Sequence, residues 1–120
     1  MTYSSISIES GHIDRDGNLP VYYDIYAPVA SPGTVFKVIL FLHGFKGFKD
    51  WGAFPDACEE LARAGYVLVA MNFSRNGYGG SREEVTEPDS FAEQTLSADL
   101  QDVEDVIDAI KRGQISHSKV

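Results

Sequence analysis

Two uninterrupted apolar runs dominate the hydrophobic pattern of this chain, one over residues 38–42 and one over residues 66–71. Neither run alternates with polar residues, which is typical of strands that are buried on both faces inside a parallel sheet. The pattern therefore predicts strands near 36–42 and 66–71 in the interior of an α/β sheet.

Two segments that alternate between apolar and polar residues precede these runs, near residues 3–9 and 20–26. The residues between them, 11–18, are rich in Gly, Asp and Asn and predict a loop. Two such strands joined by a loop are typical of an antiparallel hairpin with one face open to water. His12 falls within the loop, where we expect a solvated surface side chain.

Apolar residues recur at helical spacing in two further segments, which predict helices near 54–64 and 91–112. Pro55 suits the first turn of the first helix and Gly65 suits the position after its end. Ser90 and Glu93 have the spacing of a capping box for the second helix. The first apolar stripe consists of Phe54, Ala57, Cys58, Leu61 and Ala62, and the second of Leu96, Leu100, Val103, Ile107 and Ile110.

Strand, helix and strand in succession form a βαβ unit, so the expected domain is an α/β fold over residues 1–120 with helices on both faces of the sheet. The net charge of −8 argues against nucleic acid and anionic membranes as partners. Residues 83–108 carry ten acidic residues and no Lys or Arg, which we interpret as a solvated helix face.

Compartment and metal chemistry follow from what the sequence lacks. No apolar stretch approaches the ~20 residues that span a bilayer, and the N-terminus does not resemble a secretory signal, so we expect a cytoplasmic protein. The single cysteine, Cys58, lies on the first helical stripe, where packing explains it better than reactivity. The three histidines show no metal-ligand spacing, and we expect neither a metal nor a cofactor.

The first apolar run ends in a turn with two glycines, residues 43–47, His-Gly-Phe-Lys-Gly. Glycines let the backbone approach a ligand closely, and N–H groups at such a turn can stabilise a negative charge without reorganising. On these grounds the turn is either an anion or oxyanion cradle or an ordinary loop.

Two stretches carry a family resemblance, residues 43–51 (His-Gly-Phe-Lys-Gly-Phe-Lys-Asp-Trp) and residues 72–77 (Asn-Phe-Ser-Arg-Asn-Gly). Together with the order of the expected elements, they resemble the N-terminal half of an α/β-hydrolase. The similarity is greatest to the dienelactone-hydrolase-like and serine-aminopeptidase-like esterases, and it extends over nearly the whole chain.

The resemblance implies acyl transfer from a small ester, thioester or amide substrate. In that family a serine attacks the carbonyl, a histidine is the base, an acidic residue orients it, and two backbone N–H groups hold the oxyanion. By motif position, one of these N–H groups belongs to Phe45. His43 and Gly44 would shape the loop, while Phe48 and Trp51 would line an acyl pocket or serve in packing.

The sequence departs from the family in one respect: it contains no Gly-x-Ser-x-Gly elbow for the nucleophile. The resemblance places that elbow on the next strand, so we expect an N-terminal part truncated before the nucleophile strand, with nucleophile, acid and base further along the protein. The remainder of the domain would then cover the edge of strand 38–42. We expect the 120-residue chain alone to be inactive and either prone to aggregation or partly molten.

Three alternatives stay open. Ser74 and His43 follow adjacent strands and could form a catalytic pair, although Ser74 lacks flanking glycines and suits a loop-fixing hydroxyl better. The chain could also be a non-catalytic binding module on a hydrolase scaffold. A Rossmann-like nucleotide-binding domain is the third alternative, but Gly44 and Gly47 do not form Gly-x-Gly-x-x-Gly and Asn72 stands where an acidic ribose ligand is expected.

Overall fold

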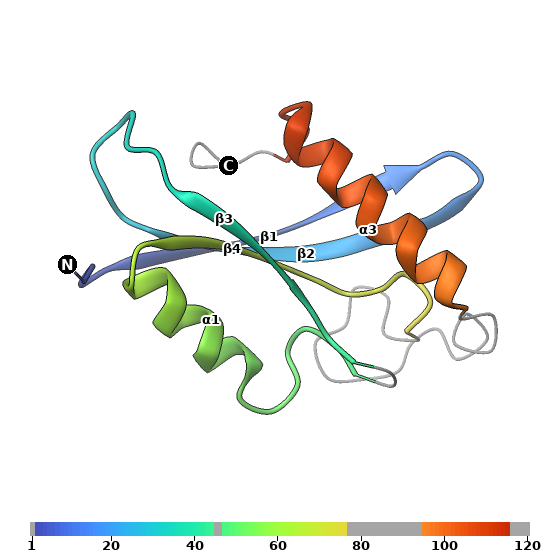
Figure 1. The fold of residues 1–120 in the computed structure, drawn as a ribbon, viewed down its shortest axis with the longest axis horizontal. Coiled ribbons are helices and arrows are strands. Elements are labelled where there is room, and N and C mark those ends of the chain that lie inside the picture. The colour runs from blue at the N-terminus through green and yellow to red at the C-terminus, as the bar shows by residue number, and fades with distance from the viewer. Residues whose placement is uncertain (1, 45–46, 77–94, 116–120) are drawn as a thin grey trace.

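One four-stranded mixed sheet forms the centre of the computed structural model, which describes residues 2–44, 47–76 and 95–115 (Figure 1). The strands are β1 (Ile6–Arg15), β2 (Asn18–Pro28), β3 (Lys37–Leu42) and β4 (Tyr66–Met71). The described helices are α1 (Phe54–Arg63) and α3 (Leu96–Lys111). Neither of these helices combines the length and the hydrophobicity that a membrane crossing requires.

The strand order is β1-β2-β4-β3, with β3 and β4 parallel and the other two neighbouring pairs antiparallel. The chain is therefore an α/β domain, as the hydrophobic pattern predicts. Strands β3 and β4 are joined through α1, which packs mainly on β4 and β2. This βαβ unit brings the carboxyl ends of β3 and β4 to the same edge of the sheet.

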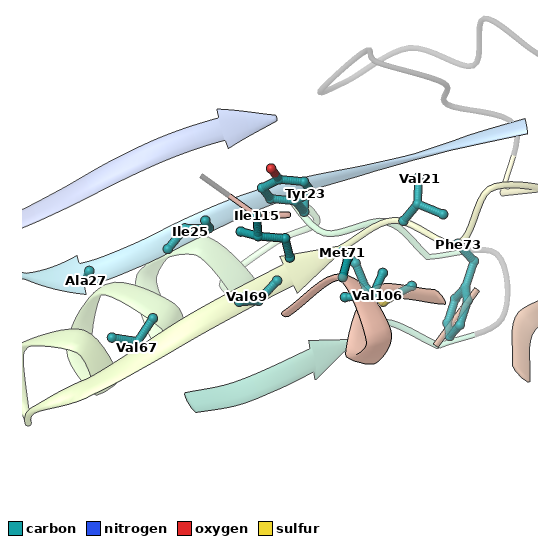
Figure 2. Packing of buried hydrophobic residues seen from close by; sticks show 11 residues of the cluster. Val21, Tyr23, Ile25, Ala27, Val67, Val69, Met71, Phe73, Val106 and Ile115 are labelled. Atoms are coloured by element: carbon teal, nitrogen blue, oxygen red, sulfur yellow. The ribbon is translucent and has the colours of Figure 1, made fainter. Parts of the chain in front are cut away.

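The core lies on both faces of β4, because successive side chains of a strand point to opposite faces. On one face Val67, Val69 and Met71 pack with residues of β2 and with Val106 of α3 (Figure 2). On the other face Leu68 packs with residues of α1, among them Cys58. The apolar run of β4 is thus buried on both sides by two separate clusters.

The hairpin of β1 and β2 is longer than expected, and the prediction of a loop over 11–18 is wrong. Gly11 pairs with Tyr23 inside the sheet, and a Cβ atom at Gly11 would lie 2.6 Å from the Tyr23 hydroxyl oxygen. The glycine therefore makes room for an aromatic ring and does not mark a turn. The turn itself lies at Asp16–Gly17, where Gly17 has a φ of 69°, as Asp-Gly hairpins require. Consequently His12 lies in β1, half exposed, and not in a loop.

The second helix begins later than expected, at Leu96 and not near 91. Thr95 has an extended backbone, and its hydroxyl accepts a hydrogen bond from the Ala98 N–H at 3.1 Å, so it caps the helix. The expected capping box of Ser90 and Glu93 lies outside the described residues. The other end of α3 is near the expected position, and α1 ends one residue before the expected one.

The buried face of α3 matches the predicted apolar stripe only in part: Val103 and Ile110 pack against the core, and the other three members are exposed. Leu96, Leu100 and Ile107 are 76%, 56% and 38% exposed, whereas Asp102 and Val106 are buried. The buried face is shifted about the helix axis toward Asp102, whose carboxylate, described below, contacts the hairpin. Asp102 therefore does not belong to a solvated acidic face.

β3 is an edge strand of the described sheet, and its apolar run is only partly buried, although Leu40 packs on one core cluster and Ile39 and Phe41 on the other. It pairs with β4 on one side, and Val38 and Leu42 are 39% and 44% exposed. Among the described residues no strand pairs with its other side. An apolar edge with unpaired backbone groups is a template for association with another strand.

We predict that the 120-residue chain self-associates through this edge. Lysine on an edge strand opposes pairing, so the double variant Val38→Lys/Leu42→Lys should stay smaller in light scattering across a protein concentration series. Val35→Lys is the matched control, because Val35 is 91% exposed but precedes the strand. Equal association of the edge variant and the control would contradict the prediction, as would a monomeric chain at all concentrations.

Candidate functional site

The two stretches that carry the family resemblance meet at the carboxyl ends of β3 and β4. Leu42 and Met71, the last residues of the two strands, are register partners, so His43 and Asn72 leave the sheet side by side. Both side chains are buried. Because neighbouring parallel strands end at one edge, residues 30 positions apart in sequence come into direct contact.

His43 connects the two stretches through its ring. Its Nε2 atom accepts a hydrogen bond from the Phe73 N–H at 3.1 Å, and its Nδ1 atom lies 2.8 Å from the Gly44 carbonyl oxygen. Since Nε2 accepts, Nδ1 carries the proton and donates it to Gly44. The Phe73 ring packs edge-on against the imidazole, with 4.9 Å between centroids. Burial lowers the pKa of His43, while the Gly44 bond and the charge of Asp99 raise it less.

The two glycines of the turn have different roles. The Gly44 carbonyl accepts both the His43 Nδ1–H and the Gly47 N–H, the latter at 2.9 Å. A Cβ atom at Gly47 would lie 2.9 Å from that same carbonyl oxygen, whereas one at Gly44 would meet no described atom within 4 Å. The close backbone approach therefore requires glycine at 47, and Gly44 shapes the loop through its carbonyl.

Lys49 makes a second connection between the stretches and also binds the sheet. Its backbone N–H donates to the Asn72 Oδ1 atom at 2.7 Å. Its side chain is 7% exposed, and the ammonium group donates to Asp24 of β2 at 2.7 Å and to Asp50 at 2.6 Å. The Asp24 carboxylate also accepts from the Ser10 hydroxyl at 2.5 Å. Sequence analysis missed this cluster, although a charged residue inside the apolar hairpin strand was a signal that a buried partner exists.

Asp102 of α3 makes a third connection, to the segment that follows β4. Its carboxylate accepts from the Ser74 N–H at 2.7 Å and from the Ser74 hydroxyl at 3.0 Å. Arg15 of the hairpin donates to it at 2.7 Å, and both side chains are almost fully buried. The other guanidinium nitrogens of Arg15 donate to the Leu19 carbonyl oxygen. Ser74 therefore fixes a loop, the role that its sequence context suggests.

The remaining predicted site residues lie in different surroundings. Phe45, the expected oxyanion donor, lies outside the described residues. Phe48 is half-buried, while Trp51 is 57% exposed and packs edge-on against Phe54 of α1. One shallow depression in the described part of the chain is lined by other residues, namely Gly17, Asn18, Leu19 and Arg75.

The hydrogen bonds restrict the chemistry of these side chains. His43 Nε2 already accepts the Phe73 N–H, and the Ser74 hydroxyl donates to Asp102, so the two do not form a Ser–His pair. The Cys58 thiol is buried, which raises its pKa to about 11 and leaves it protonated at neutral pH. Within the described ranges, no group of three His, Cys, Asp or Glu residues is placed to hold a metal. What the arrangement supplies is a set of hydrogen bonds that hold the described residues on either side of 45–46, namely His43, Gly44, Gly47 and Lys49.

Comparisons with known proteins show the fold and nothing finer. No family model matches the chain, and no curated protein matches it. The crystal structure of the hypothetical protein PA2218 from Pseudomonas aeruginosa is similar, with a TM-score of 0.54 and 14% sequence identity. The alignment covers 80% of this chain and 33% of that chain, so this chain spans about a third of its structural neighbour.

We predict that Asp102→Ala lowers the free energy of unfolding by about 3 kcal/mol or more, because the buried Arg15 guanidinium then loses the carboxylate of Asp102. Asp108→Ala is the matched control, since Asp108 is an exposed carboxylate of the same helix. Urea denaturation of both variants measures the difference. A loss at Asp102 no larger than that at Asp108 would show that the buried contact adds nothing to stability.

We also predict that His43 makes stability depend on pH. Its pKa is lowered in the folded chain from an ordinary value of 6.5, so between these two values the unfolded chain binds more protons. The contribution of His43 is therefore complete above pH 6.5 and is lost as the pH falls toward the lowered pKa. Urea denaturation across this range should give a steeper fall for the native chain than for His43→Gln, and parallel curves would refute the prediction.

Proposed function

We propose that this domain is the N-terminal part of an α/β-hydrolase that cleaves small acyl esters, thioesters or amides through a serine nucleophile. In this proposal the turn after β3 supplies one oxyanion N–H group, from Phe45, and the serine, base and acid come from later in the protein. The proposal requires no cofactor.

The observation that carries the proposal is the double connection between the two motif stretches. His43 and Lys49 on one side bind Phe73 and Asn72 on the other, so the turn after β3 is held at both ends. Oxyanion stabilisation needs backbone N–H groups that do not reorganise during the reaction. The neutral, fully bonded imidazole of His43 suits a structural part in the loop better than the part of a base.

The sheet supports the same proposal. Among the strands that the structure describes, the order β1-β2-β4-β3 places β3 at one end of the sheet, with its other side available to a further strand. We propose that the nucleophile strand of the same domain pairs there and covers Val38 and Leu42. The similar structure reported above is a longer chain, of which the alignment covers 33%. Its length is compatible with a larger domain of this kind.

A nucleotide-binding function has no comparable support. Asn72 occupies the position at which a Rossmann-like domain presents an acidic ribose ligand. Its side-chain oxygen accepts the Lys49 N–H and is buried, so it is already used within the protein.

The test measures ester turnover by the full-length gene product with p-nitrophenyl acetate and butyrate. We expect turnover, and a loss of about 10²-fold in kcat for Phe45→Pro, because proline has no N–H to donate. Phe45→Ala is the matched control, since it shortens the side chain but keeps the amide, and it should stay near the native kcat.

Three outcomes would contradict the proposal. The full-length protein could fail to turn over esters, thioesters and peptides; it could lack a Gly-x-Ser-x-Gly serine; or Phe45→Pro and Phe45→Ala could lose activity equally. Thermal unfolding of each variant verifies that the changes in rate are not changes in folding. A folded protein that binds acyl ligands without the serine would instead be a binding module on this scaffold.

A further inference from the structure

Lys49 is unusual for a lysine, because it lies in the loop that joins β3 to α1 and yet its side chain is almost fully buried. Lysine is almost never fully buried unless it is paired. Here the ammonium donates to Asp24, in the middle of β2, and to its neighbour Asp50. A residue of a strand-to-helix loop is thus bound to the interior of the sheet.

The Asp24 carboxylate is itself held in place. Asp24 pairs with Ser10 on one side and with Ala70 on the other, so its backbone is fixed by both neighbouring strands. One carboxylate oxygen accepts the Ser10 hydroxyl, and the other faces the Lys49 ammonium. Lys49 therefore binds a rigid acceptor and not a mobile surface carboxylate.

The backbone of Lys49 makes an independent contact, through its N–H to the Asn72 side chain. Asn72 is fixed in turn, since its own N–H donates to the Tyr22 carbonyl oxygen at 2.9 Å. The same residue thus binds β2 through its side chain and the end of β4 through its backbone. Two directional contacts to two strands specify the position of residues 47–52 more sharply than apolar packing would.

From these contacts we propose that Lys49 is a positioning residue that fixes residues 47–52, which lead from the turn after β3 into α1, against the middle of β2 and the carboxyl end of β4. Its kinetic consequence rests on the proposed hydrolase function, because only an oxyanion donor makes the position of this turn matter for a rate. Catalytic groups must be held to within about 0.5 Å of their productive positions. Loss of the anchor should therefore lower kcat and leave substrate binding largely intact.

The experiment compares Lys49→Met with Lys37→Met in the full-length protein. Lys37 is an exposed lysine at the start of β3 and serves as the matched control. We expect Lys49→Met to lower kcat by about tenfold to 10²-fold, up to the effect of losing one oxyanion donor, with KM within about twofold, and Lys37→Met to change neither. Lys49→Arg keeps the charge and should recover part of the lost kcat.

Lys49→Met leaves buried carboxylates without their cation, and the variant could fail to fold. The double variant Lys49→Met/Asp24→Asn removes the ammonium together with the more deeply buried of its two carboxylate partners, and we expect it to fold and to allow the same measurements. Hydrogen exchange of the Phe73 amide, which binds His43, gives a readout that does not need activity. This amide should exchange at least tenfold faster in the double variant, while the Leu68 amide in the middle of β4 should keep its rate.

Unchanged Phe73 exchange and unchanged kcat in the double variant would overturn the inference. So would an equal acceleration at Phe73 and Leu68, because Lys49 would then stabilise the whole sheet and not position the turn. If the native protein shows no ester turnover, the proposed function fails by itself, and the exchange measurement alone decides the role of Lys49.

Discussion

The hydrogen bond from the Phe73 N–H to His43 Nε2 is the contact on which the arrangement of the site depends. It requires a neutral imidazole with the proton on Nδ1, and that proton in turn holds the Gly44 carbonyl. One side chain thereby joins the end of β3, the turn that follows it and the end of β4. The cost of burying a histidine is acceptable here because both ring nitrogens are bonded.

Two buried ionic clusters extend this connection to the rest of the domain. Lys49 and Asp24 join the loop before α1 to β2, while Arg15 and Asp102 join the hairpin to α3. Each pair is directional and nearly inaccessible to water, so each resists displacement of the elements that it joins. The apolar clusters stabilise the layers of the domain, and these polar contacts determine how the loops at one edge are positioned.

In the hairpin and in α3, the local sequence pattern predicts a different structure from the one that the tertiary contacts produce. Gly11 is a residue type that is common in turns, yet it lies in a strand. The Tyr23 ring occupies the space that a side chain at position 11 would need. Asp102 has the sequence context of a solvated face, yet it is buried because it pairs with Arg15. The two residues are 87 positions apart in sequence but in direct contact in the structure. Neither partner is visible in a window of local periodicity.

The sequence by itself determined the α/β class, the positions of β3, β4 and α1, and the two stretches that meet at the edge, because hydrophobic periodicity and turn residues are local properties. The candidate oxyanion turn was also visible in the order of its glycines and its place after a strand. Only the tertiary structure decided the tautomer of His43, the burial of Lys49 and Asp102, and the face that α3 presents to the core. These depend on contacts between residues distant in sequence, and the cost of burying a charge is settled by its partner and not by its neighbours along the chain.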